Sequence, residues 1–270
     1  MPPVFTKESP MKRTLIQPDL SAIPARFHPF LQDASVFDSS CSRLAKVFYL
    51  EKGDGFFLKT APAGTLAKEA AMTHFFHEKG LGAQVLDYVT LDADWMLTRK
   101  VPGEDCLHPM YLEDPQRLCD ITAQLLRQLH EMAPDHAPVN RTADILATAR
   151  KNYQVSAYDL SLFPDNWGYA TPEEAWEELC RNSRYLQSDT LLHGDYCLPN
   201  IILQDWQFSG FIDLDAAGAG DRHIDLFWGI WSLEFNLKTD QYRQRFLDAY
   251  GRDLVCEDAL RTVAACEVFL

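Results

Sequence analysis

Three oxygen-bearing side chains in the second half of the chain constrain its fold most strongly. Asp195 and Asn200 stand in the string HGDYCLPN, between two short apolar runs, and Asp213 ends the next apolar run, GFID. These runs predict three short strands, at Thr190–Leu192, Ile201–Leu203 and Phe208–Ile212. Neighbouring strand ends would bring the three side chains together. Mg²⁺ prefers oxygen ligands of this kind, usually one or two carboxylates with water and phosphate.

The spacing of these residues matches the phosphoryl-transfer plan of protein kinases. In that plan a catalytic-loop Asp accepts the hydroxyl proton, and a following Asn and a second Asp hold metal. Here the strings are H-G-D and I-D-L-D rather than H-R-D and D-F-G. An isolated HGD would indicate only a turn with a capping Asp. Both elements at this spacing predict a kinase-type site.

An upstream pair supports the same plan. Lys59 lies in the strand expected at Phe56–Thr60, and Glu69 lies early in the helix expected after it. In kinases, such a Lys holds the α- and β-phosphates and pairs with a helix Glu. No GxxxxGK[ST] string occurs, which excludes a P-loop. The glycine-free loop DSSCSR offers serine candidates for capping the phosphates instead: Ser39, Ser40 and Ser42.

Composition limits the partners. The chain has 270 residues, of which 47% are hydrophobic and 24% charged, a globular composition. Its formal net charge of −14 repels nucleic-acid backbones and anionic membranes and attracts cations. We therefore expect neither a nucleic-acid nor a membrane partner.

The cysteines and the N-terminus indicate a compartment. The 7 cysteines are odd in number and none has CxxC spacing, which argues against disulfides and zinc and for reducing conditions. The N-terminal string MPPVFTKESPMKRTL lacks the apolar core of a signal peptide, and the chain has no long apolar run. We expect a cytoplasmic protein.

The pattern changes from strands to helices near residues 101–103. Before the break we predict one helix and four strands, the latter at Lys46–Glu51, Phe56–Thr60, Val85–Thr90 and Trp95–Thr98. After it, helices begin at Asp114-Pro115 and Thr171-Pro172, and three more fill residues 221–270. The prediction is an α+β fold with a nucleotide-binding lobe at residues 1–100 and a catalytic, substrate-binding lobe at 101–270. A cleft between such lobes is the expected ligand site.

The motifs HGDxxxxN and GFIDxxxxxxxDRxxDL resemble those of the aminoglycoside phosphotransferase family, nearest to its 3′-phosphotransferases. The resemblance covers the chain from about residue 35 onwards. It implies a bilobal protein-kinase-like fold, a small β-rich lobe with a larger helical one. It also implies transfer of the γ-phosphoryl group of ATP, or of GTP, to an antibiotic hydroxyl, with Mg²⁺ as cofactor and resistance as the outcome.

The resemblance also implies residue roles. Asp195 would be the catalytic base, Asn200 and Asp213 the Mg²⁺ ligands, and Lys59 and Glu69 the phosphate-positioning pair. The hinge that reads adenine would be supplied by Thr98, Arg99 and Val101, with Ser42 at the phosphates. His193 would brace the catalytic loop. Two further family positions, expected to organise a helix start, are Asp221 and Asp225.

The substrate side follows from the same resemblance. Family members bind a polycation through scattered carboxylates, and the matching positions here are Asp165, Asp195, Glu234, Glu267 and the terminal Leu270. The chain departs from the family pattern at five positions: Ala216 and Trp231 where the relatives carry Arg, Phe235 where they carry Glu, Gly168 where one branch carries an acid, and Leu270, which adds one residue to the tail. These departures bear on the antibiotic range and on which hydroxyl is modified. We expect a monomer or a weak dimer.

Two other functions fit the same fold. One is a kinase for a small metabolite such as choline, an amino sugar or a ketosamine, which would show one aromatic cage around a single ammonium rather than several carboxylates. The other is a non-enzymatic kinase-like binding module. That interpretation requires the loss of a catalytic position, and all five catalytic positions are present.

Overall fold

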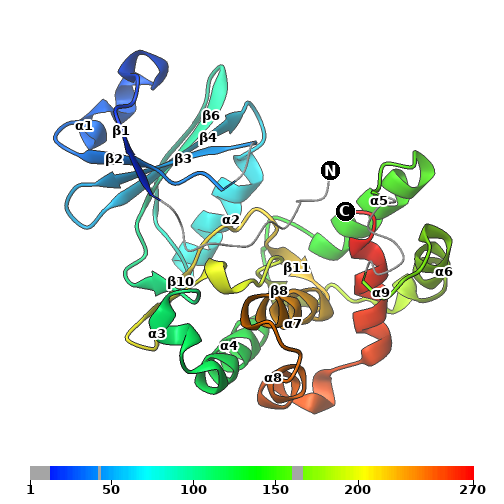
Figure 1. The fold of residues 1–270 in the computed structure, drawn as a ribbon. Helices are drawn as coiled ribbons and strands as arrows, with labels where there is room; N and C mark the ends of the chain where they lie inside the picture. Colours follow the sequence, from blue (N-terminus) through cyan, green and yellow to red (C-terminus); the bar gives the residue numbers. More distant parts are fainter. Residues whose placement is uncertain (1–12, 42–43, 160–166) are drawn as a thin grey trace. The chain divides into compact units, whose positions relative to one another are not determined.

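A computed structural model describes residues 13–41, 44–159 and 167–270 (Figure 1). The chain divides into two compact units. We call them the N-terminal unit, which comprises described residues up to His108 and the segment Pro199–Asp215, and the C-terminal unit, which comprises Pro109–Leu198 and Ala216–Leu270. The division differs from the single boundary expected after residue 100, because the segment 199–215 returns to the N-terminal unit.

A 6-stranded antiparallel sheet forms the frame of the N-terminal unit, in the order β1-β2-β3-β4-β6-β5. Leu50 on β3 and Leu58 on β4 are fully buried in its core. The β3–β4 turn contains Gly53 and Gly55, both with positive φ, which side chains rarely tolerate. The strands of this sheet are β1 (Thr14–Ile16), β2 (Ser35–Asp38), β3 (Lys46–Glu51), β4 (Phe56–Pro62), β5 (Val85–Thr90) and β6 (Ala93–Arg99).

Two helices belong to the N-terminal unit, the short α1 (His28–Leu31) and the longer α2 (Ala67–Glu78). Ala70 of α2 packs in one apolar cluster with Leu66 and with Met96 of β6, so that α2 is held against the sheet (Figure 1). The buried carboxylate of Asp94 accepts the backbone N–H of Leu66 at 2.8 Å, just before the helix begins.

A hairpin completes the N-terminal unit. Its strands β9 (Ile201–Gln204) and β10 (Gln207–Phe211) pair antiparallel, and β7 (Glu104–Asp105) pairs with β9 on its other side. The backbone N–H of Phe211 donates to the carbonyl of Leu81 at 2.7 Å, and its ring meets Phe76 of α2 edge-on. These contacts explain why the hairpin belongs to this unit.

The C-terminal unit is mainly helical. Its central helix α7 packs against α4, α8 and α9, and α9 also packs against α5 and α6. One small antiparallel pair joins β8 to β11. The elements are α3 (Pro109–Leu112), α4 (Pro115–His130), α5 (Arg141–Gln154), α6 (Pro172–Asn182), β8 (Thr190–Leu192), β11 (Gly218–Gly220), α7 (His223–Leu237), α8 (Arg243–Tyr250) and α9 (Glu257–Glu267).

Side-chain caps fix where the helices begin. Asp114 and Thr171 accept the backbone N–H groups of Arg117 and Glu174, each at 3.2 Å, and a proline follows each cap. This confirms the two predicted helix starts. Asn140 caps α5, which was not predicted, in the same way.

The predicted strands and the three C-terminal helices are confirmed, with boundaries shifted by a few residues. The prediction did not include the first two strands of the sheet, β1 and β2, or the two-to-three-residue strands β7 and β11, since such short segments carry little periodicity. The partner of β8 is β11 rather than the following hairpin. In the described part of the chain, no helix is long and apolar enough to span a membrane.

Candidate active site

Lys59 lies at the centre of an ion-pair cluster within the N-terminal unit. Its Nζ is 2.7 Å from Oε2 of Glu69 on α2 and 3.1 Å from Oδ1 of Asp213 after β10. The strand–helix pair expected from the sequence is therefore formed, and Asp213 joins it. Lys59 and Glu69 are largely buried, whereas the side chain of Asp213 is 51% exposed.

The cluster carries more negative than positive charge. Burial alone would lower the pKa of Lys59, but the carboxylates of Asp213 and Glu69 outweigh burial and raise that pKa above its ordinary value. Burial raises the pKa of Glu69 to about 7; the attraction of Lys59 opposes this effect, and the charges of Asp213 and Asp215 add to it. One ammonium thus faces several carboxylates, an arrangement that a divalent cation would balance.

The β9–β10 hairpin brings Asn200 and Asp213 to the same end. Asn200 directly precedes β9 and Asp213 follows β10 after one residue, so the antiparallel pairing places their segments side by side. The backbone N–H of Ile212 donates to the carbonyl of Asn200 at 3.1 Å. The two residues supply one amide and one carboxylate. Within the described residues, no group of three or more His, Cys, Asp or Glu side chains could hold a metal.

A small cavity of about 210 Å³ opens beside the expected hinge, within the N-terminal unit. Val101 lines it together with Lys100, while Ile202 and Ile212 provide apolar lining from the hairpin side. Thr98 and Arg99 are not among its described lining residues. Thr98 is buried in β6, and the Arg99 side chain donates to Gln84. Of the three predicted hinge residues, only Val101 therefore lines the cavity.

Asp195 belongs to the C-terminal unit and lies in a loop whose backbone is hydrogen-bonded to Asp225 of α7. The two carboxylate oxygens of Asp225 accept the backbone N–H groups of His193 at 2.8 Å and Gly194 at 2.6 Å. Asp225 is fully buried. The Asp195 N–H in turn donates to Nδ1 of His193 at 3.3 Å. The loop geometry before Asp195 is thus set by a buried carboxylate and a histidine ring.

Glycine is required at position 194. Its φ is +83°, and a Cβ there would lie 1.8 Å from the carbonyl oxygen of Ala216. Side chains rarely adopt that φ, and the backbone contact cannot be relieved by a rotamer change. The middle residue of the HGD string is therefore dictated by the fold.

More of the C-terminal unit supports the loop. His130 of α4 bonds to Asp225 through Nε2 at 3.1 Å and to the Tyr250 hydroxyl through Nδ1 at 2.8 Å. Burial lowers the pKa of His130 and so favours the neutral ring, in which Nε2–H donates to the carboxylate. Farther along, the Ser232 hydroxyl accepts the Leu198 N–H at 2.9 Å. Helix α7 therefore holds both ends of the loop.

Glu267, near the end of α9, lies in the same unit and is only 9% exposed. Its Oε1 accepts the indole N–H of Trp228 at 3.2 Å. Burial raises the pKa of Glu267 to about 7, the charge of Arg141 and the Trp228 bond oppose that rise, and the charge of Asp195 adds to it. Glu267 is thus close enough to Asp195 for their charges to interact, and it is a poorly solvated acid that a cation would stabilise.

No contact with Asp195 is described for the other predicted substrate residues. Glu234 lies on α7, where burial raises its pKa and the charges that act on it are those of Arg243 and Asp240. Leu270 packs against the apolar core around α9. Asp165, like the predicted phosphate-loop residue Ser42, lies outside the described residues. Ser40, another serine candidate for capping the phosphates, accepts the Val47 N–H with its hydroxyl at 3.0 Å.

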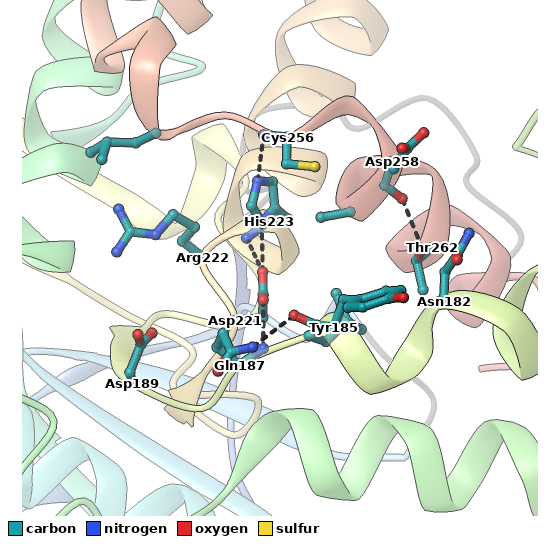
Figure 2. Close-up of a pocket in the computed structure, with 13 residues that line it drawn as sticks. Asn182, Tyr185, Gln187, Asp189, Asp221, Arg222, His223, Cys256, Asp258 and Thr262 are labelled. Atoms are coloured by element: carbon teal, nitrogen blue, oxygen red, sulfur yellow. Dashed lines mark hydrogen bonds and ion pairs between the residues drawn. The ribbon is translucent and has the colours of Figure 1, made fainter.

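A cavity of about 450 Å³ lies elsewhere in the C-terminal unit, and Figure 2 shows its lining. At its centre His223 bridges two elements: Nδ1 is 2.6 Å from Asp221, and Nε2 accepts the Cys256 N–H at 2.9 Å (Figure 2). Because Nε2 accepts, the proton is on Nδ1 and points to the carboxylate. Asp221 organises the start of α7 by this bond and by accepting the His223 N–H.

The sequence matches the model of the phosphotransferase enzyme family over residues 41–264. This match extends over more than half of the chain. The chain belongs to that family. The family prediction is therefore confirmed.

Named relatives agree with the family. A protein of Lactococcus lactis called a probable aminoglycoside 3′-phosphotransferase is 47% identical over 253 residues, 93% of this chain and 96% of the relative. An aminoglycoside 3′-phosphotransferase of Streptomyces fradiae is 28% identical over 72% of this chain and 76% of the relative.

Solved structures confirm the kinase-like fold. The crystal structure of an aminoglycoside 3′-phosphotransferase of type VIII superposes with a TM-score of 0.70 at 23% identity. The superposition covers 91% of this chain and all of that one. At this level of identity, the comparison supports the fold and not the residue roles.

The sequence analysis missed several residues that shape the site. Asp225 lies at a helix start as expected, but its carboxylate also holds the loop before Asp195, which was not expected. His130, Ser232 and Arg141 carried no signal, because each lies far along the chain from the residue it supports. Of the supporting residues, only Asp225 carried a signal, through the string DRHIDL.

Proposed function

We propose that this chain is an ATP-dependent O-phosphotransferase that phosphorylates the 3′-hydroxyl of an aminoglycoside antibiotic and thereby confers resistance. The observation that carries the proposal is the 47% identity, over nearly the whole of both chains, to the Lactococcus lactis relative of that name. The Lys59–Glu69–Asp213 cluster and the held Asp195 loop supply the residues that the reaction needs.

The nucleotide would be bound by the N-terminal unit. Lys59 keeps its charge and would bind the phosphates, and Glu69 would hold the ammonium in place. The cavity beside Val101 would receive the base. A neighbour of 23% identity, an aminoglycoside phosphotransferase from Streptomyces rimosus, was solved with ADP and streptomycin, which supports a nucleotide here. ATP is the expected donor, and GTP fits the same roles.

Asn200 and Asp213 would hold Mg²⁺. Their amide and carboxylate oxygens are hard ligands, and the surplus negative charge around Lys59 fits a divalent cation. When bound, such a cation neutralises charge that builds on the β- and γ-oxygens during transfer.

Asp195 would orient the acceptor hydroxyl and accept its proton. Its backbone is fixed by His193 and, through the two preceding N–H groups, by Asp225, so little reorganisation is needed at the moment of reaction. Phosphoryl transfer is mostly a matter of positioning and charge stabilisation.

The acceptor would be bound by the acidic residues of the C-terminal unit. Glu267 lies near enough to Asp195 for their charges to interact, and as a poorly solvated acid it would pair with an ammonium of the antibiotic. Asp165, Glu234 and Leu270 remain predicted contacts. Adding a phosphate would cancel positive charge that ribosomal RNA recognises. We expect the enzyme to act in the cytoplasm, where ATP and ribosomes are, as a monomer or a weak dimer.

One observation favours the metabolite-kinase alternative. Several aromatic rings, those of Trp167, Trp228 and Trp231 among them, gather near a single buried acid, Glu267. An aromatic group of this kind could surround one ammonium. A kinase for choline, an amino sugar or a ketosamine would have that arrangement.

An acceptor panel tests the proposal. The purified chain is incubated with MgATP and with kanamycin, neomycin, streptomycin, choline, glucosamine or a ketosamine, and ADP release is measured for each. NMR of the product locates the new phosphate. We expect efficient transfer to the 3′-hydroxyl of kanamycin and neomycin. Turnover of choline, glucosamine or the ketosamine alone would establish the alternative.

A further inference from the structure

Arg13, which directly precedes β1, lies over the ring of Tyr49 on β3. The central carbon of its guanidinium is 4.1 Å from the centroid of the Tyr49 ring and 5.9 Å from that of Phe57 on β4. Tyr49 and Phe57 are paired directly across the two strands, so their side chains share one face of the sheet. Because an aromatic face attracts a cation and a planar guanidinium can stack on it, Arg13 is held over this face.

Arg13 also lines the cavity of about 210 Å³ beside the expected hinge. Phe57 and Val101 belong to the same lining, and all three residues are part of the N-terminal unit. Arg13 is exposed to solvent as well, so it lies at the rim of the cavity. The wall beside the hinge is therefore built in part by a residue from the beginning of the chain, which the motifs do not include.

Acidic residues of the cavity favour a cation at this place. Glu104 and Asp105 are both part of the lining. Burial raises the pKa of Asp105, and the charge of Glu104 adds to that rise, whereas the charge of Arg13 opposes it. Within the described residues, the Arg13 guanidinium has no hydrogen bond or ion pair. Its N–H donors are therefore available to a ligand in the cavity.

The cavity marks the nucleoside end of the proposed nucleotide site. Its described lining includes Val101 of the expected hinge. The proposed phosphate and metal residues Lys59, Glu69 and Asp213 are not among the residues described there. The base or the ribose of a nucleotide, rather than its phosphates, would thus meet Arg13. Both carry hydrogen-bond acceptors for a guanidinium, and a purine also offers a flat face on which Arg can stack.

We propose that Arg13 is a nucleotide-binding residue, which contacts the nucleoside part of the donor at the rim of this cavity while Tyr49 holds its guanidinium in place. The inference rests on the proposed function and deepens it, because it adds a contact from the start of the chain to the hinge, Lys59 and the metal residues. Both the stacking and the directed N–H donors belong to the planar guanidinium, so Lys would not replace Arg fully here.

Calorimetry with ADP and with adenosine tests the proposal in the full chain. Arg13→Ala should weaken the binding of both ligands about fivefold, the loss of one partly exposed guanidinium contact, while KM for kanamycin stays unchanged. Arg13→Lys keeps the charge without the planar group and should recover only part of the affinity. Lys79→Ala is the matched control: Lys79 lies 4.7 Å over the Phe75 ring of the same unit, away from the described cavity lining, and its removal should change neither affinity.

A double-mutant cycle tests whether Tyr49 holds Arg13. Tyr49→Leu removes the ring and keeps an apolar side chain, so it should also weaken adenosine binding. If the two residues act together, the double variant should bind adenosine no more weakly than Arg13→Ala alone, and additive losses would show that Arg13 does not depend on Tyr49. Thermal melts establish that each variant is folded. Arg13 is exposed, so its variants should melt as the wild type does and can be read without the cycle.

The outcomes separate this inference from the proposed function. If the wild type phosphorylates kanamycin and folded Arg13→Ala binds adenosine and ADP as well as the wild type does, the role of Arg13 is wrong and the proposed function stands. Tighter binding by Arg13→Ala would show that Arg13 blocks the cavity, and a loss confined to ADP would place it at the phosphates; either result overturns the inference. A wild type that neither binds nucleotide nor phosphorylates any acceptor would overturn the proposed function itself.

Discussion

Asp213 combines a strained backbone with a charged contact. Its φ of 59° lies in the left-handed region, which costs a non-glycine residue on the order of 1 kcal/mol or more, although Asp and Asn tolerate it best. Its carboxylate reaches Lys59 at 3.1 Å. Strain that persists beside a buried ammonium is typical of a functional position.

The role of Asp213 can be isolated with Asp213→Asn, since Asn keeps the backbone preference and removes the charge. We expect nucleotide affinity, measured by calorimetry, to fall about tenfold or more with Mg²⁺ present, because a charged ligand of the metal is lost. In EDTA the affinity should match that of the wild type. An equal loss in EDTA would show that Asp213 does not act through the metal.

Glu267 predicts a pH dependence. Its pKa is raised by burial to about 7, so the acid is mostly neutral at pH 6 and mostly ionised at pH 8. Because only the carboxylate pairs with an ammonium, KM for kanamycin should fall as the pH rises through about 7. Glu267→Gln should flatten this profile. A wild-type profile as flat as that of the variant would contradict the role of Glu267.

The raised pKa of Glu267 also predicts how folding stability depends on pH. A raised pKa means that the folded chain binds the Glu267 proton more tightly than the unfolded chain does. Folding stability from this group is therefore lost as the pH rises from the ordinary 4.5 to about 7, and Glu267→Gln should remove that loss. Thermal melts at several pH values measure the difference.

At the scale of elements, α7 links the catalytic loop to the rest of the C-terminal unit. Asp225, in the first turn of the helix, accepts two backbone N–H groups of the loop, and Ser232 accepts a third about two turns later. The loop carries the proposed base, Asp195, and its backbone geometry depends on these hydrogen bonds to α7.

Asp225→Asn tests this dependence. An amide can accept only part of what the buried carboxylate accepts, and its NH₂ group would face backbone donors. Hydrogen bonds to charged groups contribute about 1.5–3 kcal/mol each, so we expect unfolding free energy to fall by about 3 kcal/mol and kcat to fall with it. Asp240→Asn, an exposed Asp just after the helix, is the control. A variant with wild-type stability and kcat would mean that the loop keeps its geometry without the Asp225 carboxylate.

The sequence predicted the proposed catalytic residues better than the residues that hold them in place. Asp195, Asn200 and Asp213 could be found because they stand at fixed spacings around β8 and the β9–β10 hairpin, which the sequence pattern predicts. Asp225 was found only as a helix-start residue, and His130 not at all, since contacts between α4, α7 and the loop are made by tertiary packing. The hinge was predicted at Thr98, Arg99 and Val101, but of these only Val101 lines the cavity, because Thr98 is buried in β6 and the Arg99 side chain donates to Gln84.

At the scale of the whole molecule, the net charge of −14 complements a polycationic substrate. A field of this sign raises the rate of encounter with cations and is screened by salt. We expect kcat/KM for kanamycin to fall steeply between low and high ionic strength, while kcat changes little. A kcat/KM independent of salt would show that charge does not guide binding.

The C-terminal segment illustrates how function and folding overlap. Cys266, Val268 and Phe269 are buried in the apolar core around α9, beside Glu267. Deleting this segment to test substrate binding would therefore remove core packing as well. The point substitution Glu267→Gln is the cleaner test of the acid.

The central claim is that Asp195 serves as the base in transfer from ATP to an aminoglycoside hydroxyl. The most direct measurement compares phosphorylation of kanamycin by the wild type and by Asp195→Asn, alongside nucleotide affinity for both. We predict phosphokanamycin from the wild type, a kcat about 10²–10⁴-fold lower in the variant, and equal ATP affinity, because the variant loses a proton acceptor and keeps its shape. A variant within tenfold of the wild-type kcat would contradict the account.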